Sequence, residues 1–394
     1  MNLRLAQRVQ RIRPSTTVSI TGLAVRLREE GKDIIALSVG EPDFPSPSHV
    51  SEAACKAIHD GDTKYTAIDG ARSLKVAIRD KFRRDNDLDF DLDQIIVSNG
   101  GKQSCYNACQ ALLEAGDEVI IPSPYWVSFP EMVRLTNAEP TIVHTSQDQG
   151  FRMSANQFKT AITERTRALI INSPSNPTGS AYTRSDWLAL AAVLEENPRI
   201  FVITDDIYEH IYWGEKPFCS LLTACPELSD RVLTVNGVSK CYSMTGWRIG
   251  YAAGPIDLIT AMTTIQSQST TSPSTISQAA ACAALTGDQS FVKEKCEIFR
   301  KRHSMVVEYL NELKGFECQP ADGAFYVFPN IQEAIEVIGV ADDVQFCERL
   351  LTETGVALVP GSAFGAANHL RFSFAADLDT LEKALDRMKT FLAA

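Results

Sequence analysis

The chain has 394 residues, of which 44% are hydrophobic and 22% charged, and its formal net charge is −11. The composition is typical of a globular protein, and the length favours two domains over a single core. The acidic charge argues against nucleic-acid or membrane-surface partners, although a local cationic pocket remains compatible with it. The sequence shows no signal peptide and no apolar run of about 18 residues, so we expect a cytoplasmic protein without a membrane span. The ten cysteines lack metal-ligand spacing, so reduced thiols and no metal site are expected.

From about residue 51 the pattern alternates between helices and short apolar strands, after an arm and a basic helix in residues 1–30. Helices are expected at 74–84, 103–114 and 185–196. Strands are expected at 94–97, 118–121, 141–144, 168–172, 200–204, 231–235 and 248–253. Strands that are apolar almost throughout indicate a sheet buried on both faces and largely parallel. The predicted fold class is α/β.

The C-terminal part of the chain has a different pattern. A long helical run near 291–313 precedes expected strands near 324–328, 356–359 and 370–374, and an amphipathic helix completes the chain. This order predicts a smaller α+β domain that the N-terminal segment completes. The expected division is 1–48 for the arm and part of the small domain, 49–290 for the large domain and 291–394 for the small domain.

Polar residues follow the predicted strands at their carboxyl ends, where open α/β sheets bind ligands. Gly100 and Gly101 open a helix whose backbone N–H groups suit a phosphate, although a plain strand-to-helix turn explains them equally well. Asn176 lies between two prolines, which also suits a rigid loop. Asp205 ends the next strand, with Tyr208 one turn later, and an acid there also serves as a helix N-cap.

Lys240 lies in a loop of small residues after the strand at 231–235, and Arg248 follows eight residues later. Such a lysine is usually a solvated charge, but burial or nearby cations lower its pKa and allow a Schiff base with an aldehyde. A phosphate cradle, a carboxylate, a phenol, an amide and a lysine together match the needs of pyridoxal phosphate. Asp205 would keep the pyridine nitrogen protonated, and Tyr208 and Asn176 would hydrogen-bond the ring oxygen. The two glycines and Arg248 would hold the phosphate.

Trp126, in Ser-Pro-Tyr-Trp-Val-Ser, is a candidate for stacking on the cofactor ring, with a core tryptophan as the alternative. The motifs Ser-Asn-Pro-Thr-Gly, Asp-Asp-Ile-Tyr and Ser-Lys with an arginine eight residues after the lysine occur in one order. In these motifs the chain resembles the fold-type I pyridoxal-phosphate-dependent aminotransferases of class I/II over nearly its whole length. The resemblance implies a mostly parallel seven-stranded sheet in the large domain. It also implies that Lys240 is the Schiff-base lysine and the base that moves the Cα proton.

The resemblance implies further site residues. Tyr65 corresponds to a tyrosine that reaches the phosphate of the neighbouring subunit's cofactor, which implies a homodimer with composite active sites. Arg371, in His-Leu-Arg-Phe-Ser, corresponds to the arginine that binds the substrate α-carboxylate in a bidentate pair. Gly40 matches a loop whose backbone contacts the substrate. Some relatives carry a serine phosphate ligand where this chain has Gly237, and Ser239 is the expected replacement.

Four residues bear on the choice of substrate. Lys102 resembles the lysine with which one branch of bacterial aspartate aminotransferases binds the distal carboxylate of the substrate. A lysine is unfavourable at a helix N-terminus, so a functional reason is favoured over a simple phosphate-loop charge. Ser15 and Thr17 match hydroxyls that line the same pocket. Arg13 matches a basic position of members that also transaminate prephenate, and an exposed arm arginine is the alternative.

The resulting expectation is transfer of the amino group of L-aspartate to 2-oxoglutarate, in two half-reactions with ping-pong kinetics. A prephenate or aromatic aminotransferase, or an enzyme with dual activity, is the nearest alternative. A pyridoxal-phosphate-dependent lyase acting at Cβ is more distant. The sensor domain of a transcriptional regulator is disfavoured by the acidic charge and by the lack of a helix-turn-helix before the motifs.

Overall fold

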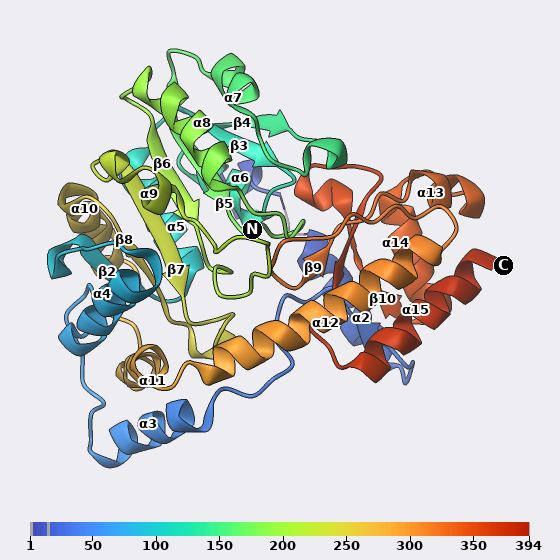
Figure 1. Ribbon diagram of the computed structural model, residues 1–394, viewed down its shortest axis with the longest axis horizontal. Coiled ribbons are helices and arrows are strands. Elements are labelled where there is room, and N and C mark those ends of the chain that lie inside the picture. The colour runs from blue at the N-terminus through green and yellow to red at the C-terminus, as the bar shows by residue number, and fades with distance from the viewer. Residues whose placement is uncertain (1–2, 14–15, 394) are drawn as a thin grey trace.

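The computed structural model describes residues 3–13 and 16–393, with the backbone alone at 16–19. Its larger part is built on a seven-stranded sheet with the strand order β2-β8-β7-β6-β5-β3-β4 (Figure 1). The strands are β2 (Ile95–Ser98), β3 (Glu118–Ser123), β4 (Glu139–His144), β5 (Thr166–Asn172), β6 (Phe201–Asp205), β7 (Val232–Gly237) and β8 (Gly250–Ala253). Only β8 runs antiparallel to its neighbours, so the predicted α/β class with a mostly parallel sheet of seven strands is confirmed.

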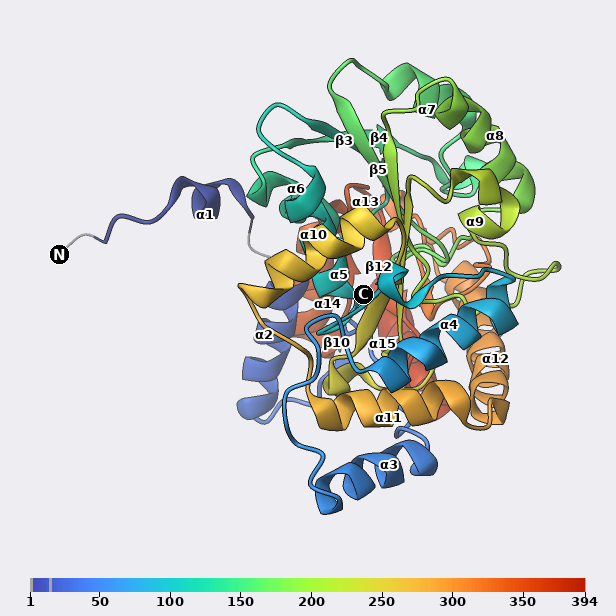
Figure 2. The ribbon, with the colours of Figure 1, turned by 90° about the vertical axis from the view of Figure 1, so that its left-hand side faces the viewer.

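Helices cover both faces of this sheet (Figure 2). Neighbouring strand residues point to opposite faces, so Ile170 packs with one helical layer and Ile171 with the other. The first layer contains α5 (Gly101–Leu112), α6 (Ser128–Leu135) and α10 (Ile256–Ser267). The second contains α4 (Arg72–Asn86), α7 (Ala155–Ala161), α8 (Arg184–Glu195), α9 (Leu221–Ala224) and α11 (Thr275–Thr286), and α3 (Ser48–His59) packs outside α11. No helix in the described ranges combines the length and apolar character that a membrane span requires.

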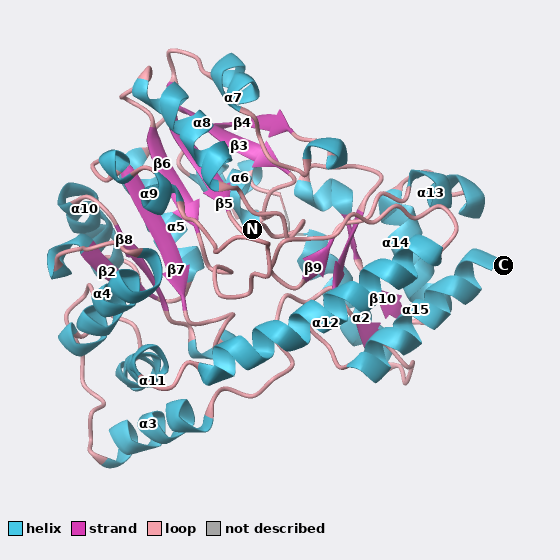
Figure 3. Cartoon of the chain, viewed as in Figure 1, coloured by secondary structure: helices cyan, strands magenta, loops and turns pink. Residues whose placement is uncertain are grey.

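The smaller part contains two short sheets, drawn in magenta on the right of Figure 3. The long helix α12 (Ser290–Glu312) leads into it, and α13 (Gln332–Ile338), α14 (Asp343–Thr354) and α15 (Leu378–Ala393) cover it. One sheet has the order β11-β12-β9, and the other pairs β1 with β10 in parallel. These strands are β1 (Ile35–Ala36), β9 (Tyr326–Val327), β10 (Val356–Ala357), β11 (Val359–Pro360) and β12 (Leu370–Ser373).

The single strand expected at 356–359 is wrong. The chain leaves one sheet at Leu358 and joins the other, because β10 pairs with β1 whereas β11 pairs antiparallel with β12. A pattern of buried apolar residues does not distinguish one strand from two short strands with different partners.

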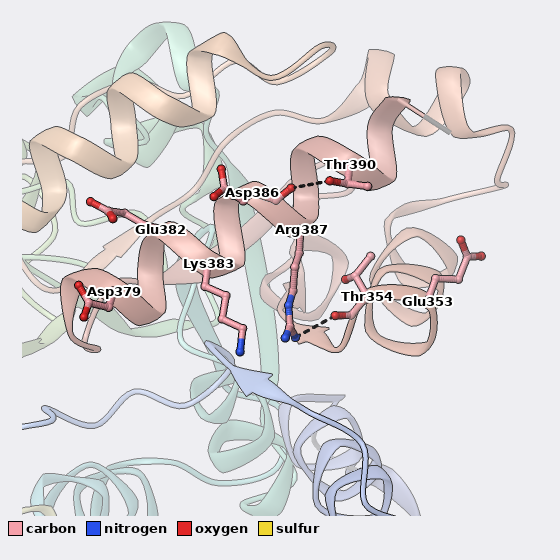
Figure 4. A pocket seen from close by; sticks show the side chains of 8 residues that line it. All are labelled: Glu353, Thr354, Asp379, Glu382, Lys383, Asp386, Arg387 and Thr390. Atoms are coloured by element: carbon pink, nitrogen blue, oxygen red, sulfur yellow. Dashed lines mark hydrogen bonds between the residues drawn. The ribbon is translucent and has the colours of Figure 1, made fainter.

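The N-terminal segment packs against the smaller part. The side chain of Lys383 in α15 lies 2.7 Å from the Asp33 carboxylate. Arg387 donates to the backbone oxygen of Asp33 at 2.9 Å and to that of Thr354 at 3.0 Å, and Figure 4 shows the second of these bonds. Before this segment come α1 (Gln7–Arg11), which projects away from the body in Figure 2, and α2 (Thr16–Glu29). The domain boundaries given above stay a prediction.

Candidate active site

A cavity of about 700 Å³ lies where β5, β6 and β7 end, between the large sheet and the smaller part. Eleven of the residues predicted from the sequence line it, namely Gly40, Gly101, Lys102, Trp126, Asn176, Asp205, Tyr208, Ser239, Lys240, Arg248 and Arg371. They come from segments that are distant in the sequence, and the carboxyl ends of parallel strands bring the central ones together.

Lys240 follows β7, and its ammonium group points into the cavity. Its Nζ donates a hydrogen bond to the backbone oxygen of Gly40 at 2.6 Å and lies 5.9 Å from the ring centre of Tyr208. Burial, aided by the charge of Arg371, lowers the pKa of Lys240 to about 8. A larger fraction of this lysine is therefore neutral near neutral pH than of an ordinary lysine, as a nucleophile or a base requires.

Asp205 ends β6 on the same side of the cavity. Burial raises the pKa of its carboxyl to about 7, although the Ile207 N–H and the charge of Lys240 oppose the shift. The preceding strand fixes this segment, because the Asn172 amide donates to the Asp205 backbone oxygen at 2.7 Å. The same amide accepts from the backbone N–H of Asn176 at 2.7 Å. Asp205 has no salt-bridge partner within residues 3–13 and 16–393, and such a buried carboxyl suits a cationic ligand group that would hold it ionised.

Two features at the start of α5 form a concave cradle. Gly100 has φ 86°, and a Cβ atom there would lie 2.3 Å from the guanidinium of Arg248, so only glycine fits. The next residues begin α5, whose first N–H groups have no intrahelical partner. Backbone donors beside an arginine are the usual binding partners of a phosphate.

The sequence predicted that Arg248 begins a strand, and this prediction is wrong. It lies two residues before β8 in the left-handed conformation, with φ 58°, after the turn Thr245–Trp247. One guanidinium nitrogen donates to the Thr245 backbone oxygen at 2.7 Å. This uncommon backbone conformation directs the side chain to Gly100 rather than along the sheet.

Arg371 is buried on β12 and faces the cavity from the smaller part. Its Nη1 donates to the Asn176 side chain at 3.0 Å, and its Nη2 donates to the Ser38 backbone oxygen. Its Nε is buried and has no hydrogen-bond partner among the described residues. A buried guanidinium with a free donor suits a carboxylate ligand.

A second cavity, of about 670 Å³, adjoins the first and shares with it Lys102, Val127, Ser128 and Arg248. Lys102 lies over the Trp126 ring, with its Nζ 4.7 Å from the ring centre, and burial and the charge of Arg248 lower its pKa. Arg13 lines this second cavity, and its backbone N–H donates to Glu131 at 2.9 Å.

Among the described residues, the predicted site residue Tyr65 lies away from both cavities. Tyr65 lies in a loop with 91% of its surface exposed, so the single chain does not use it at the site. Ser15 and the side chain of Thr17 fall outside the described residues.

The sequence prediction missed Tyr326, which is buried on β9 and lines the cavity. Its hydroxyl lies 3.0 Å from that of Tyr208, and the Arg371 guanidinium lies 4.6 Å from its ring centre. A tyrosine within an apolar strand is typical of a core, so its neighbours Phe325 and Val327 gave no signal of a site.

Comparison with known proteins identifies the family of the chain. The family model for aminotransferase class I and II matches residues 32–388. The chain belongs to the class I and II aminotransferases. Among relatives in this family, the aspartate/prephenate aminotransferase of Nitrosomonas europaea is 47% identical, over 99% of this chain and 100% of the relative.

An aspartate aminotransferase of Rhizobium meliloti is 46% identical, over 98% of this chain and 95% of the relative. The crystal structure of the aspartate aminotransferase from Rhizobium meliloti superposes with a TM-score of 0.96 at 45% identity, covering 100% of this chain and 99% of the other. The similarity therefore extends along both parts of the fold and includes the segments that line the cavity.

Proposed function

We propose that this aminotransferase moves the amino group of L-aspartate to 2-oxoglutarate, with pyridoxal phosphate as its resident cofactor. The observation that carries the proposal is the pairing of Lys240, whose pKa is lowered, with Asp205, whose pKa is raised, in one cavity with Arg371. The names of the relatives, aspartate and aspartate/prephenate aminotransferase, support the choice of substrate.

The residues present fit this cofactor. Gly100 leaves room that a Cβ would fill, and with Gly101, Ser239 and Arg248 it would hold the phosphate. When bound, the cofactor supplies an electron sink for negative charge at the substrate Cα.

The remaining groups would hold its ring. The buried Asp205 carboxylate would accept a hydrogen bond from a protonated pyridine nitrogen, and that cation would lower its raised pKa. Tyr208 and Asn176 would donate to the ring oxygen, and Trp126 would cover one face.

Two cationic groups that line one cavity suit a dicarboxylic substrate. Arg371 would bind the α-carboxylate through its free Nε, and Lys102 would bind the distal carboxylate. Lys240 would then take the proton from the substrate Cα at its Nζ and move it to the cofactor. Its lowered pKa favours the neutral amine that this step needs.

We further infer a homodimer. Tyr65 is almost fully exposed in the single chain, so a role at a phosphate requires that it reach a second copy. Refolding inactive Lys240→Ala subunits together with the less active Tyr65→Phe subunits should give more activity than the Tyr65→Phe subunits give alone, because one of the two sites of each mixed dimer would then be intact. No gain in activity in a mixture shown to contain heterodimers would contradict the composite site.

Prephenate is a second candidate substrate, and Arg13 favours it. This arginine lines the cavity that adjoins the Lys102 end of the first one, where a larger oxo acid with a second carboxylate would extend. Relatives named aspartate/prephenate aminotransferase support the same assignment.

The proposal is tested by adding each amino donor to the purified holoenzyme. L-Aspartate should convert the bound cofactor to its amino form with one equivalent of oxaloacetate, and 2-oxoglutarate should reverse the spectral change. Oxaloacetate, prephenate and phenylpyruvate are then compared as acceptors by kcat/KM. If aspartate produces no amino form of the cofactor while another donor does, the aspartate assignment is wrong.

A further inference from the structure

A buried polar cluster lies under the floor of the cavity, on the side of α4. It consists of Lys81, Asn86, Glu209 and Asn236, which are 1%, 5%, 5% and 2% exposed, and we call it the Glu209 cluster. The Glu209 carboxylate forms an ion pair with Lys81 and accepts from the side-chain amides of Asn86 and Asn236, both at 2.8 Å. The Lys81 ammonium also donates to Asn86 at 2.7 Å, so the four side chains are joined to one another, and the Nε2 atom of His210 lies 3.4 Å from the Glu209 carboxylate.

This cluster joins the two segments that carry the central side chains of the site. Glu209 directly follows Tyr208 in the loop after β6. Asn236 lies near the end of β7, four residues before Lys240, and its side-chain oxygen accepts from the Gly237 backbone N–H at 2.7 Å. One carboxylate therefore links both segments to the same point on α4, which supplies Lys81 and Asn86.

The charge distribution singles out Glu209 within this region. Burial opposes its ionisation, but the charges of Lys81 and His210 and the hydrogen bonds from Asn86 and Lys81 outweigh burial and lower the pKa of Glu209. At the neighbouring Asp206, by contrast, burial and the charges of Glu209 and Asp205 raise the pKa well above the ordinary range. Glu209 is thus a charged carboxylate that accepts hydrogen bonds from both Asn86 and Asn236.

A buried ion pair is poor evidence for a gain in stability. The desolvation of both charges offsets their attraction, and apolar replacements of similar volume are often neutral or stabilising. The two hydrogen bonds to amides, by contrast, fix directions and distances between elements. The location of the Glu209 cluster between two site segments therefore indicates a geometric role.

We propose that Glu209 is a positioning residue that holds Tyr208 and Lys240 at the separation that the cofactor requires. The inference rests on the proposed function, because both side chains are assigned there to pyridoxal phosphate. Glu209 itself does not line the cavity, so it acts through its neighbours in the chain and through Asn236.

The test compares Glu209→Gln with Glu118→Gln. Glu118 is 7% exposed, forms an ion pair with Arg165 and accepts from Thr163 at 2.6 Å, but it lies at the amino end of β3, whereas the cavity lies at the carboxyl ends of the strands. Both changes remove a buried carboxylate charge, so both should lower the melting temperature. Only Glu209→Gln should weaken the binding of pyridoxal phosphate, by about ten-fold, and shift the pH titration of the visible absorbance.

Asn236→Ala is the second variant, and it keeps the Lys81–Glu209 ion pair. It tests the link to the Lys240 segment even if Glu209→Gln does not fold. It should weaken cofactor binding, and its effect should not add to that of Glu209→Gln, since both changes act within the Glu209 cluster.

Two results together would overturn this inference while leaving the proposed function intact. Asn236→Ala would bind the cofactor and titrate like the native protein, and Glu209→Gln would behave like Glu118→Gln in both measurements. A native protein that fails to bind pyridoxal phosphate would instead refute the proposed function.

Discussion

The two sides of the cavity are built in different ways. The cofactor side consists of Asn176, Asp205, Tyr208, Lys240 and Arg248, and four of these five follow the neighbouring strands β5, β6 and β7. The carboxylate side consists of Gly40, Lys102 and Arg371, which come from three regions that no single sheet connects. The topology of one sheet therefore places the first group, whereas the second depends on packing between the two parts of the molecule.

This difference in construction has a functional consequence. The cofactor side acts in the steps that are common to all amino acid substrates, so changes there should affect all substrates alike. The carboxylate side meets the groups that differ between substrates. Changes at Lys102, and at Arg13 in the adjoining cavity, should therefore alter selectivity more than overall turnover.

Lys240→Ala should have the largest effect, and it should lower activity with every amino donor. It removes both the cofactor attachment and the Cα base, so we expect a loss of kcat of about 10⁴-fold. Mass spectrometry after borohydride reduction should show cofactor bound covalently to the native protein and none bound to the variant. The exposed Lys314→Ala is the control. A loss of activity with aspartate alone would contradict the assignment of Lys240 to the cofactor side.

Asp205→Asn should change how the stability of the cofactor-free protein depends on pH. Burial raises the Asp205 pKa from 3.8 to about 7, so the folded protein keeps a proton in this interval that the unfolded chain releases. Stability therefore falls as the pH rises from about 4 to about 7, by about 4 kcal/mol in total.

The Asp205→Asn variant lacks this loss. Denaturant unfolding should give similar free energies for the two proteins near pH 4, and a more stable variant at pH 7 and above. If the two plots of unfolding free energy against pH stay parallel across this range, burial does not destabilise the ionised Asp205 carboxylate in the cofactor-free protein.

The same contrast explains what the sequence could predict. Asp205 and Lys240 were identifiable because each follows an apolar strand, and parallel strands bring their carboxyl ends together. Tyr326 was missed because its position in the site depends on how β9 packs against the large sheet, which leaves no local pattern. The split of the strand at Leu358 was missed for the same reason, since pairing partners and not hydrophobicity decide it.

Lys102→Ala should have a smaller and selective effect. Loss of one charged contact to the distal carboxylate should lower kcat/KM for aspartate and glutamate by roughly 30-fold. An aromatic donor, which has no distal carboxylate, should lose little. Equal losses of kcat/KM with dicarboxylic and aromatic donors would indicate that Lys102 binds the cofactor phosphate rather than the substrate. Lys102 would then belong to the cofactor side of the cavity.

Arg13→Ala should have the smallest effect, and it tests how far the carboxylate side extends. Arg13 is exposed and is held through its backbone N–H to Glu131, so its side chain is free to meet a ligand in the second cavity. A solvated contact of this kind contributes about 1 kcal/mol or less, so kcat/KM for prephenate should fall by at most about five-fold. Aspartate, which is too short to leave the first cavity, should be unaffected. A variant that loses both activities equally would mean that Arg13 does not distinguish prephenate from aspartate, and that selectivity is decided at Lys102 instead.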